Sequence, residues 1–195
     1  MARNARYRLS YKRRRETKTD YQLRRILATS EHPRLVVRLS NKGIITQIIR
    51  AENIGDKVIT QATSNELVSK YGWKASEKNI PAAYLLGLII GYRTVKTGTQ
   101  IAYLDLGLKR PTKGSKVFAV VKGALDAGLD VPCDSDIISP PERISGQDIA
   151  SFAGEMAAEK YEQYFSFYLR HGLRPEQLQG HFDDVKKRIQ DEWSK

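Results

Sequence analysis

The residues best suited to chemistry lie near the start of the chain, where positive charges alternate with tyrosines. Residues 3–25 contain ten Lys or Arg against only Glu16 and Asp20. Guanidinium groups donate paired hydrogen bonds to phosphate, and tyrosine rings offer faces on which unpaired bases stack. The basic run also matches nuclear-import and membrane-surface signals, and a solvated tail is the simplest alternative. The interleaved tyrosines favour nucleic acid, because a tail that only confers solubility does not need them.

This basic arm has too few apolar side chains to build a core. Before Leu23 its large apolar-bodied residues are Tyr7, Leu9, Tyr11 and Tyr21. Such a segment cannot bury enough apolar surface to offset the entropy of its own ordering. We therefore expect the arm alone to be disordered or loosely helical, and a polyanion to order it.

Charge is distributed unevenly along the chain. The net charge of +11 divides into +8 for residues 1–25, +9 for 26–123 and −6 for 124–195. With 195 residues, the chain suits one ordinary domain and an appendage. We predict an RNA-binding arm over 1–25, an α/β core over 26–130, and an acidic strap with C-terminal helices over 131–195. The first two parts would face nucleic acid, and the last would contact a protein or be a soluble flank.

Several classes of protein do not fit this sequence. The single cysteine, Cys133, excludes an intramolecular disulfide, and no Cys/His cluster indicates zinc, so we predict no metal or cofactor. The N-terminus lacks the apolar region of a secretory signal, and its acidic residues disfavour a transit peptide. The longest apolar run, 80–92, is too short for a membrane span. We therefore expect a soluble, cytoplasmic protein without a membrane partner.

The elements that position the arm begin with a helix and three strands. Thr19 and Gln22 form a capping-box-like start to a helix ending near Ala28. Runs 34–39 and 44–50 predict a hairpin with a four-residue turn, and the run 57–63 predicts a third antiparallel strand.

Helices and one further strand then follow along the chain. We predict helices over 65–71, 80–96 and 116–127, with a covered parallel strand over 101–106 between the last two. The glycines at 87 and 91 would let the second helix pack closely on the sheet. Trp73, in the loop before that helix, would either stack on a base or cap the local core. Together these elements predict a three-layer α/β sandwich with a mixed sheet.

The last third changes character. Residues 130–144 hold three prolines and predict an irregular strap, followed by helices over 145–170 and 175–193. Apolar residues recur at three- and four-residue spacing along the first of these helices, which indicates packing onto either the domain or a partner rather than a cofactor site. They are Ile149, Phe152, Met156, Tyr161, Tyr164, Phe165 and Tyr168.

The basic loop 107–116 is a candidate phosphate cradle. It carries Lys109, Arg110, Lys113 and Lys116, and Ser115 stands where it would cap the following helix. Its glycine spacing is wrong for a nucleotide-triphosphate loop. Contact with the RNA backbone suits these residues better, and a solvated loop is the alternative.

Four segments resemble a known family. They are KRRRETKTDYQLR, PRLVVRLSNKGIITQII, YGWKASEKNIPAAYLLG and YLDLGLKRPTKGSKVFAVVKGALDAGLDVP. Together they are similar to the archaeal branch of the large-subunit ribosomal protein eighteen family, over most of residues 3–150. The resemblance implies an α/β core like that of ribonuclease H, with a basic N-terminal arm and an α-helical C-terminal extension.

The resemblance also implies a function. Members bind 5S ribosomal RNA and help attach it to large-subunit ribosomal RNA in the central protuberance of the cytoplasmic ribosome, next to other large-subunit proteins that include the other 5S-binding protein. The family's RNA contacts carry over to the arm and the hairpin turn, and we extend them to the basic loop. The residues expected to bind RNA are Arg6, Arg8, Tyr11, Lys12, Arg13, Arg14, Arg15, Lys18, Tyr21, Ser40, Asn41, Lys42, Lys109, Arg110, Lys113 and Lys116.

Three other functions share parts of this pattern. A metal-dependent nuclease needs converging carboxylates, yet Asp105 has only Asp126 and Asp130 as candidate partners, and the first two strands contain no acid. A thiol dyad of Cys133 with a histidine is disfavoured, because acidic neighbours raise a thiol pKa. We therefore expect no enzymatic activity. A general RNA chaperone would share the basic arm without requiring a defined RNA.

Overall fold

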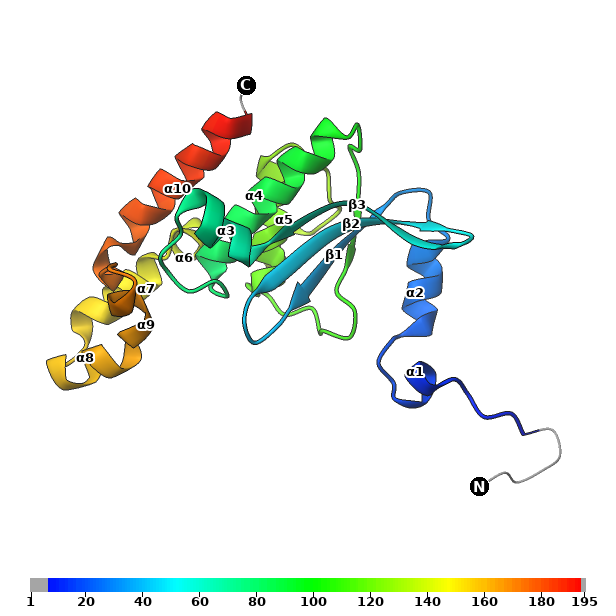
Figure 1. Ribbon diagram of the computed structural model, residues 1–195, viewed down its shortest axis with the longest axis horizontal. Helices are drawn as coiled ribbons and strands as arrows, with labels where there is room; N and C mark the ends of the chain where they lie inside the picture. The colour runs from blue at the N-terminus through cyan, green and yellow to red at the C-terminus, as the bar shows by residue number, and fades with distance from the viewer. Residues whose placement is uncertain (1–6, 194–195) are drawn as a thin grey trace.

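A mixed four-stranded sheet forms the centre of the molecule (Figure 1). The computed structural model describes residues 7–193, except for the side chains of residues 158 and 159. The strand order is β3-β2-β1-β4, with β4 parallel to β1 and the other neighbours antiparallel. The strands are β1 Arg34–Leu39, β2 Ile44–Glu52, β3 Gly55–Thr63 and β4 Tyr103–Asp105. The predicted hairpin, third strand and parallel position of the fourth are confirmed.

The fourth strand is shorter than predicted. The sequence indicated a strand over 101–106, but ladder pairing with β1 covers only Tyr103 to Asp105. Ile101 instead forms an isolated parallel bridge with Asp130, where the chain leaves the following helix. The apolar run 101–106 thus pairs with two different segments, β1 and the chain at Asp130.

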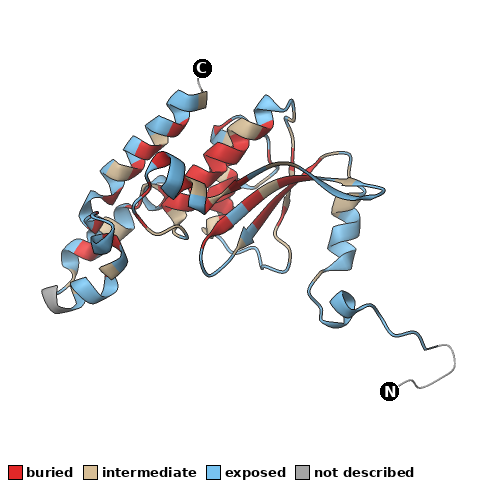
Figure 2. Ribbon diagram, in the orientation of Figure 1, coloured by how far each residue is buried: buried red, intermediate tan, exposed pale blue. Residues whose placement is uncertain are grey.

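Two helices cover one face of the sheet. They are α4 (Ile80–Lys96) and α5 (Lys116–Asp126). The side chain of Asn79 caps α4 by accepting a hydrogen bond from the N–H of Ala82 at 2.8 Å, as its position before Pro81 predicts. From Pro81 to Gly91 every residue of α4 is buried, and Figure 2 shows this stretch in red.

The glycines of α4 do not pack on the sheet as predicted. A Cβ atom at Gly87 would collide with the backbone of Val120 in α5, and one at Gly123 in α5 would collide with the backbone of Tyr84. The two helices therefore cross with their backbones in close contact. The sequence revealed the small residues but not that their partner is a helix.

On the other side of the sheet the arm forms two helices, α1 (Lys12–Arg15) and α2 (Tyr21–Ala28), and neither buries a residue. The predicted start of α2 was off by one residue. Asp20 is the cap, since its carboxylate accepts hydrogen bonds from the N–H groups of Gln22 and Leu23 at 2.9 and 3.0 Å. Helices on both sides of a mixed sheet confirm the α/β class, and likeness to the ribonuclease H core stays a prediction.

Trp73 belongs to the core. A capping box of Thr63 and Glu66 starts α3 (Ser64–Tyr71), and Gly72 ends it just before the tryptophan. The Trp73 side chain is 1% exposed and stacks on His181, with ring centroids 5.1 Å apart. Its predicted alternative role of stacking on a base is therefore wrong.

The C-terminal extension contains five α-helices within the described residues. They are α6 Pro141–Ser145, α7 Gln147–Glu155, α8 Ala158–Tyr164, α9 Ser166–Arg170 and α10 Leu178–Trp193. The single helix predicted over 145–170 is wrong. Extended backbone at Met156 and a break at Phe165 divide it, and these breaks allow both Phe165 and Tyr168 to be buried.

The last helix completes the core. α10 packs along α4 and buries Leu178, Phe182, Val185 and Ile189. It lies at the opposite end of the molecule from α1 and α2 (Figure 1). Within residues 7–193, no helix combines the length and apolar character needed to cross a membrane.

Candidate nucleic-acid interface

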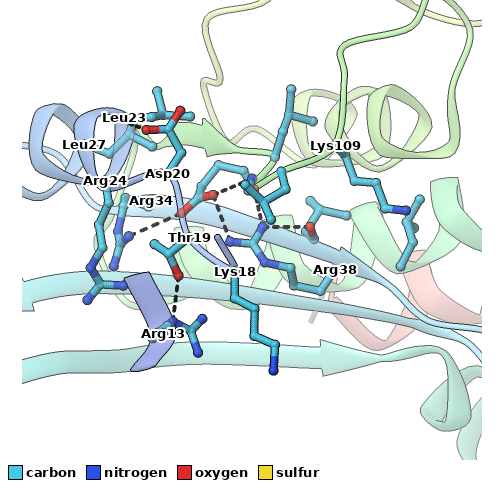
Figure 3. Close-up of a pocket in the computed structure, with 16 residues that line it drawn as sticks. Arg13, Lys18, Thr19, Asp20, Leu23, Arg24, Leu27, Arg34, Arg38 and Lys109 are labelled. Carbon is cyan, nitrogen blue, oxygen red and sulfur yellow. Dashed lines mark hydrogen bonds and ion pairs between the residues drawn. The ribbon is translucent and has the colours of Figure 1, made fainter. Parts of the chain in front are cut away.

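A cleft of about 440 Å³ lies between the arm, β1 and the segment after β4 (Figure 3). Its lining combines apolar side chains, such as Leu23 and Leu27 of α2, with six cationic residues against two carboxylates, Asp20 and Asp105. The cations are Arg13, Lys18, Arg24, Arg34, Arg38 and Lys109. Segments far apart in the sequence thus place positively charged side chains around one cleft.

The floor of this cleft is a carboxylate held between two arginines. Asp105 is buried and lies 3.2 Å from Nη1 of Arg34 and 2.9 Å from Nη2 of Arg38. Arg38 also donates to the Asp105 carbonyl at 2.7 Å. The sheet register explains the arrangement, because Asp105 lies beside Val36 and the two arginines flank that residue on one face of β1.

A second carboxylate anchors the arm to the sheet. Asp56 of β3 accepts from Arg24 of α2 at 2.8 Å and lies 2.9 Å from Arg34. Partial burial alone would raise the pKa of Asp56, but the charge of Arg34 and hydrogen bonds from Arg24 and Arg34 lower it below its usual value. Nε of the buried Arg34 has no hydrogen-bond partner among the described residues. The cleft floor therefore keeps an unused donor.

The arm itself is held by few contacts. Nε of Arg13 donates to the Thr19 hydroxyl at 2.6 Å, and the Arg14 guanidinium lies 5.7 Å from the centre of the Tyr21 ring. Lys18 pairs with Glu16 at 2.8 Å. The Tyr11 side chain is 91% exposed. The guanidinium groups and this tyrosine are thus open to a partner.

The hairpin turn presents fewer free groups than predicted. The hydroxyl of Ser40 accepts from the N–H of Gly43 at 3.0 Å and donates to its carbonyl at 2.9 Å. This hydroxyl closes the turn and leaves Asn41 and Lys42 exposed at the tip. The tip lies at the other end of β1 from α2 (Figure 1), and its residues 40–42 do not line the cleft, which ends along β1 at Leu39.

The predicted RNA-binding residues divide into groups. Arg13, Lys18 and Lys109 line the cleft. Arg8, Lys12, Arg14, Arg15 and Tyr21 are exposed on the arm beside it.

The basic loop does not act as one cradle. Arg110 and Lys113 are exposed at its middle, while Lys116 lines a different groove. Ser115 takes the cap position of α5 but makes no capping hydrogen bond through its side chain. Arg6 lies outside the described residues.

Comparisons with known proteins find relatives among ribosomal proteins. The family model of ribosomal large-subunit proteins 60S L5 and 50S L18 matches residues 5–101 and 95–134. Large ribosomal subunit protein uL18 of Caldivirga maquilingensis is 46% identical over 100% of this chain and 96% of its own length. The uL18 protein of Thermofilum pendens is 49% identical over 98% of both chains.

The chain belongs to the L5/L18 family. Its members are structural constituents of the large ribosomal subunit, not enzymes. The resemblance seen in the sequence is therefore confirmed, and membership agrees with the predicted place in the cytoplasmic large subunit.

Within this L5/L18 chain, the candidate nuclease residue has a structural role. The Asp105 carboxylate is occupied by Arg34 and Arg38, and the described residues hold no group of three or more His, Cys, Asp or Glu that could bind a metal ion. Burial, and then the charge of Asp134, raise the pKa of the Cys133 thiol, as its acidic surroundings predict.

Sequence reasoning missed Arg24, Arg34 and Arg38 as part of the cleft. A spacing of four residues places Arg34 and Arg38 on the same face of a strand, which was a usable signal. Their shared carboxylate was not visible, because Asp105 lies 71 residues from Arg34 and meets it only through the parallel pairing of β4.

Proposed function

We propose that this chain binds 5S ribosomal RNA and helps attach it to large-subunit ribosomal RNA in the central protuberance. It would do so alongside other large-subunit proteins, including the other 5S-binding protein. The observation that carries the proposal is the cleft, where cations from the arm, β1 and the loop after β4 converge. Membership in the L5/L18 family supports the ribosomal setting.

The geometry suggests two kinds of phosphate contact. Arg38 is partly exposed and held by Asp105, so it would meet a phosphate with little loss of side-chain entropy, while the buried Arg34 keeps Asp105 in place. The arm residues, such as Arg14 and Arg15, are exposed and would order against the RNA as they release its counterions. The floor would position the RNA, and the arm would add affinity that depends on salt.

Specificity would come from RNA shape and from unpaired bases. The major groove of an A-form helix is too narrow for side chains to read. Exposed groups at two places are suited to unpaired bases, namely Tyr11 on the arm and Asn41 at the hairpin tip. We expect Asn41→Ala to change preference among RNAs more than it changes the salt dependence of binding.

The test is equilibrium binding to 5S ribosomal RNA over a salt series, with transfer RNA as competitor. The full chain is compared with a variant that lacks residues 1–18. We expect binding that survives competition, and a shortened chain that binds more weakly and less salt-dependently. Equal competition by transfer RNA would contradict a specific 5S function and favour a general RNA-binding protein.

A further inference from the structure

A second groove, of about 550 Å³, lies where the core meets the C-terminal extension. One wall is the start of α4, including Ile80 and Pro81, and Lys116 contributes from the first turn of α5. The other wall comes from α7, α8 and α9 and the Phe165 break between the last two. Of the described residues expected to bind RNA, only Lys116 lines this groove.

Exposed aromatic rings form the outer part of the extension wall. The side chain of Phe152 is 55% exposed and that of Tyr164 is 66% exposed. The packing onto the domain predicted for this apolar stripe is thus incomplete for these two residues, and packing onto a partner stays a prediction. They have open faces because the breaks around α8 turn Phe165 and Tyr168 inward instead.

A buried neighbour holds the ring of Phe152 in place. Phe165 packs edge-to-face on Phe152 at 6.4 Å and on Tyr168 at 5.9 Å between ring centroids. The Tyr168 hydroxyl accepts a hydrogen bond from the amide of Asn79 at 3.4 Å. The groove is thus preformed, so a ligand would not have to order it.

The rim of the groove is positive. Lys78, Lys116 and Arg143 line it, against the single carboxylate of Asp148. Asp148 lies 3.8 Å from Arg143, whereas the two lysines form no ion pair within the described residues. Both lysines come from residues 26–123, which carry a charge of +9, so the core side of the groove supplies the excess of positive charge.

We propose that this groove binds an unpaired nucleotide of RNA. The base would stack on Phe152 or Tyr164, and its phosphates would meet Lys78 and Lys116. Apolar side chains of a partner protein would fill the groove but leave the two unpaired lysines without anions. A nucleotide supplies both a flat base, which stacks on an aromatic ring, and a negatively charged phosphate, which pairs with a lysine. The inference rests on the proposed function in taking RNA as the ligand.

Photo-crosslinking of the full chain tests this proposal. The probe is a short single-stranded oligouridine that carries one 5-iodouridine, a base that reacts with aromatic rings stacked on it. Mass spectrometry then locates the adducts. We expect adducts at Phe152 or Tyr164, and a fall of about tenfold in their yield in the Lys78→Ala/Lys116→Ala variant.

Matched variants separate the groove from the arm. Phe152→Leu/Tyr164→Leu keeps exposed apolar side chains but removes the rings, so the groove adducts should vanish while arm adducts remain. Arg170→Ala/Lys187→Ala removes two exposed cations elsewhere in the extension and should leave the groove yield unchanged. Thermal unfolding of each variant checks that the fold is intact.

The outcomes distinguish the two proposals. Adducts confined to the arm and cleft would overturn the groove site while leaving the proposed function in place, and would favour a protein occupant. Absence of adducts throughout the chain would also overturn the groove site, and the 5S ribosomal RNA titration would still decide the proposed function separately. Groove adducts that persist in the lysine variant would also overturn the proposal, because phosphate recognition is part of it.

Discussion

The arm supplies positive charge to the surface of the molecule, whereas the C-terminal extension supplies apolar side chains to its core. Neither α1 nor α2 buries a residue, yet the arm supplies many of the cations at and beside the cleft. The extension carries net negative charge, yet α10 buries four apolar side chains against the core. We therefore expect the arm to determine the affinity for RNA and the extension to determine the stability of the fold. Changes in the arm should weaken RNA binding in a stable protein, and changes in α10 should destabilise a protein whose binding surface is intact.

The Asp105 carboxylate is the strongest test of this separation, since it lies in the cleft but is buried. Asp105→Asn removes the charge that holds Arg34 and Arg38, and should lower the free energy of unfolding by about 3 kcal/mol. Denaturant unfolding measures the loss, with Asp136→Asn on an exposed carboxylate as control. A loss as small as that of the control would mean that the ion pairs contribute nothing to stability.

The extension is tested by a change in its buried face. Ile189→Ala in α10 leaves a cavity where the side chain is fully buried, and should cost about 3 kcal/mol of unfolding free energy. The exposed neighbour Gln190→Ala should cost almost nothing. RNA affinity, measured where both variants remain folded, should match that of the unmodified chain. Weaker binding by the folded Ile189 variant would break the division between the two regions.

The arm is tested by its charges. Arg13→Ala/Arg14→Ala/Arg15→Ala should reduce the slope of log affinity against log salt by up to about three, if each guanidinium contacts one phosphate. The melting temperature should not change, because none of these residues is buried. The matched control, Arg170→Ala/Arg174→Ala/Lys187→Ala, removes equal charge from the extension. An equal fall in slope for both variants would point to non-specific attraction.

The smallest expected effect concerns pH and the contact between α10 and the core. Burial, and then the charges of Lys74 and Arg188, lower the pKa of His181 below 6.5, against an opposing effect of Asp184. Its Nε2 accepts a hydrogen bond from the N–H of Lys74 at 3.1 Å, which requires the neutral ring.

The sign of the pH effect follows from where the proton binds. Below pH 6.5 the unfolded chain takes up a proton at His181 before the folded chain does. Stability is therefore complete above this pH and falls as the pH drops toward the folded-state value. Thermal unfolding from pH 7.5 to pH 5 should show a shallower loss in His181→Gln. Parallel curves for the two proteins would contradict this role.

Local signals predicted much of the fold, and long-range contacts explain the errors. The turn at 40–43 and the start of α4 at Asn79 depend on neighbouring residues, so the sequence was sufficient to place them. The breaks near Met156 and Phe165 depend on packing against the core, which the helical spacing of the apolar stripe did not show. The cationic arm was predictable from composition. The cleft was not, because its floor depends on the register in which β4 pairs with β1. The division of the chain at residues 25 and 130 stays a prediction.

The stacking of Trp193 on Tyr92 has a consequence for the order of events during synthesis. The two rings lie parallel at 6.3 Å, and Lys70 pairs with Glu192 beside them, so the last turn of α10 is fastened to α3 and α4. Translation makes α4 long before α10, and the apolar surface that α10 covers stays open to water in the meantime. The arm is made before both of these helices. A nascent chain can therefore meet RNA through its arm before its hydrophobic core is closed.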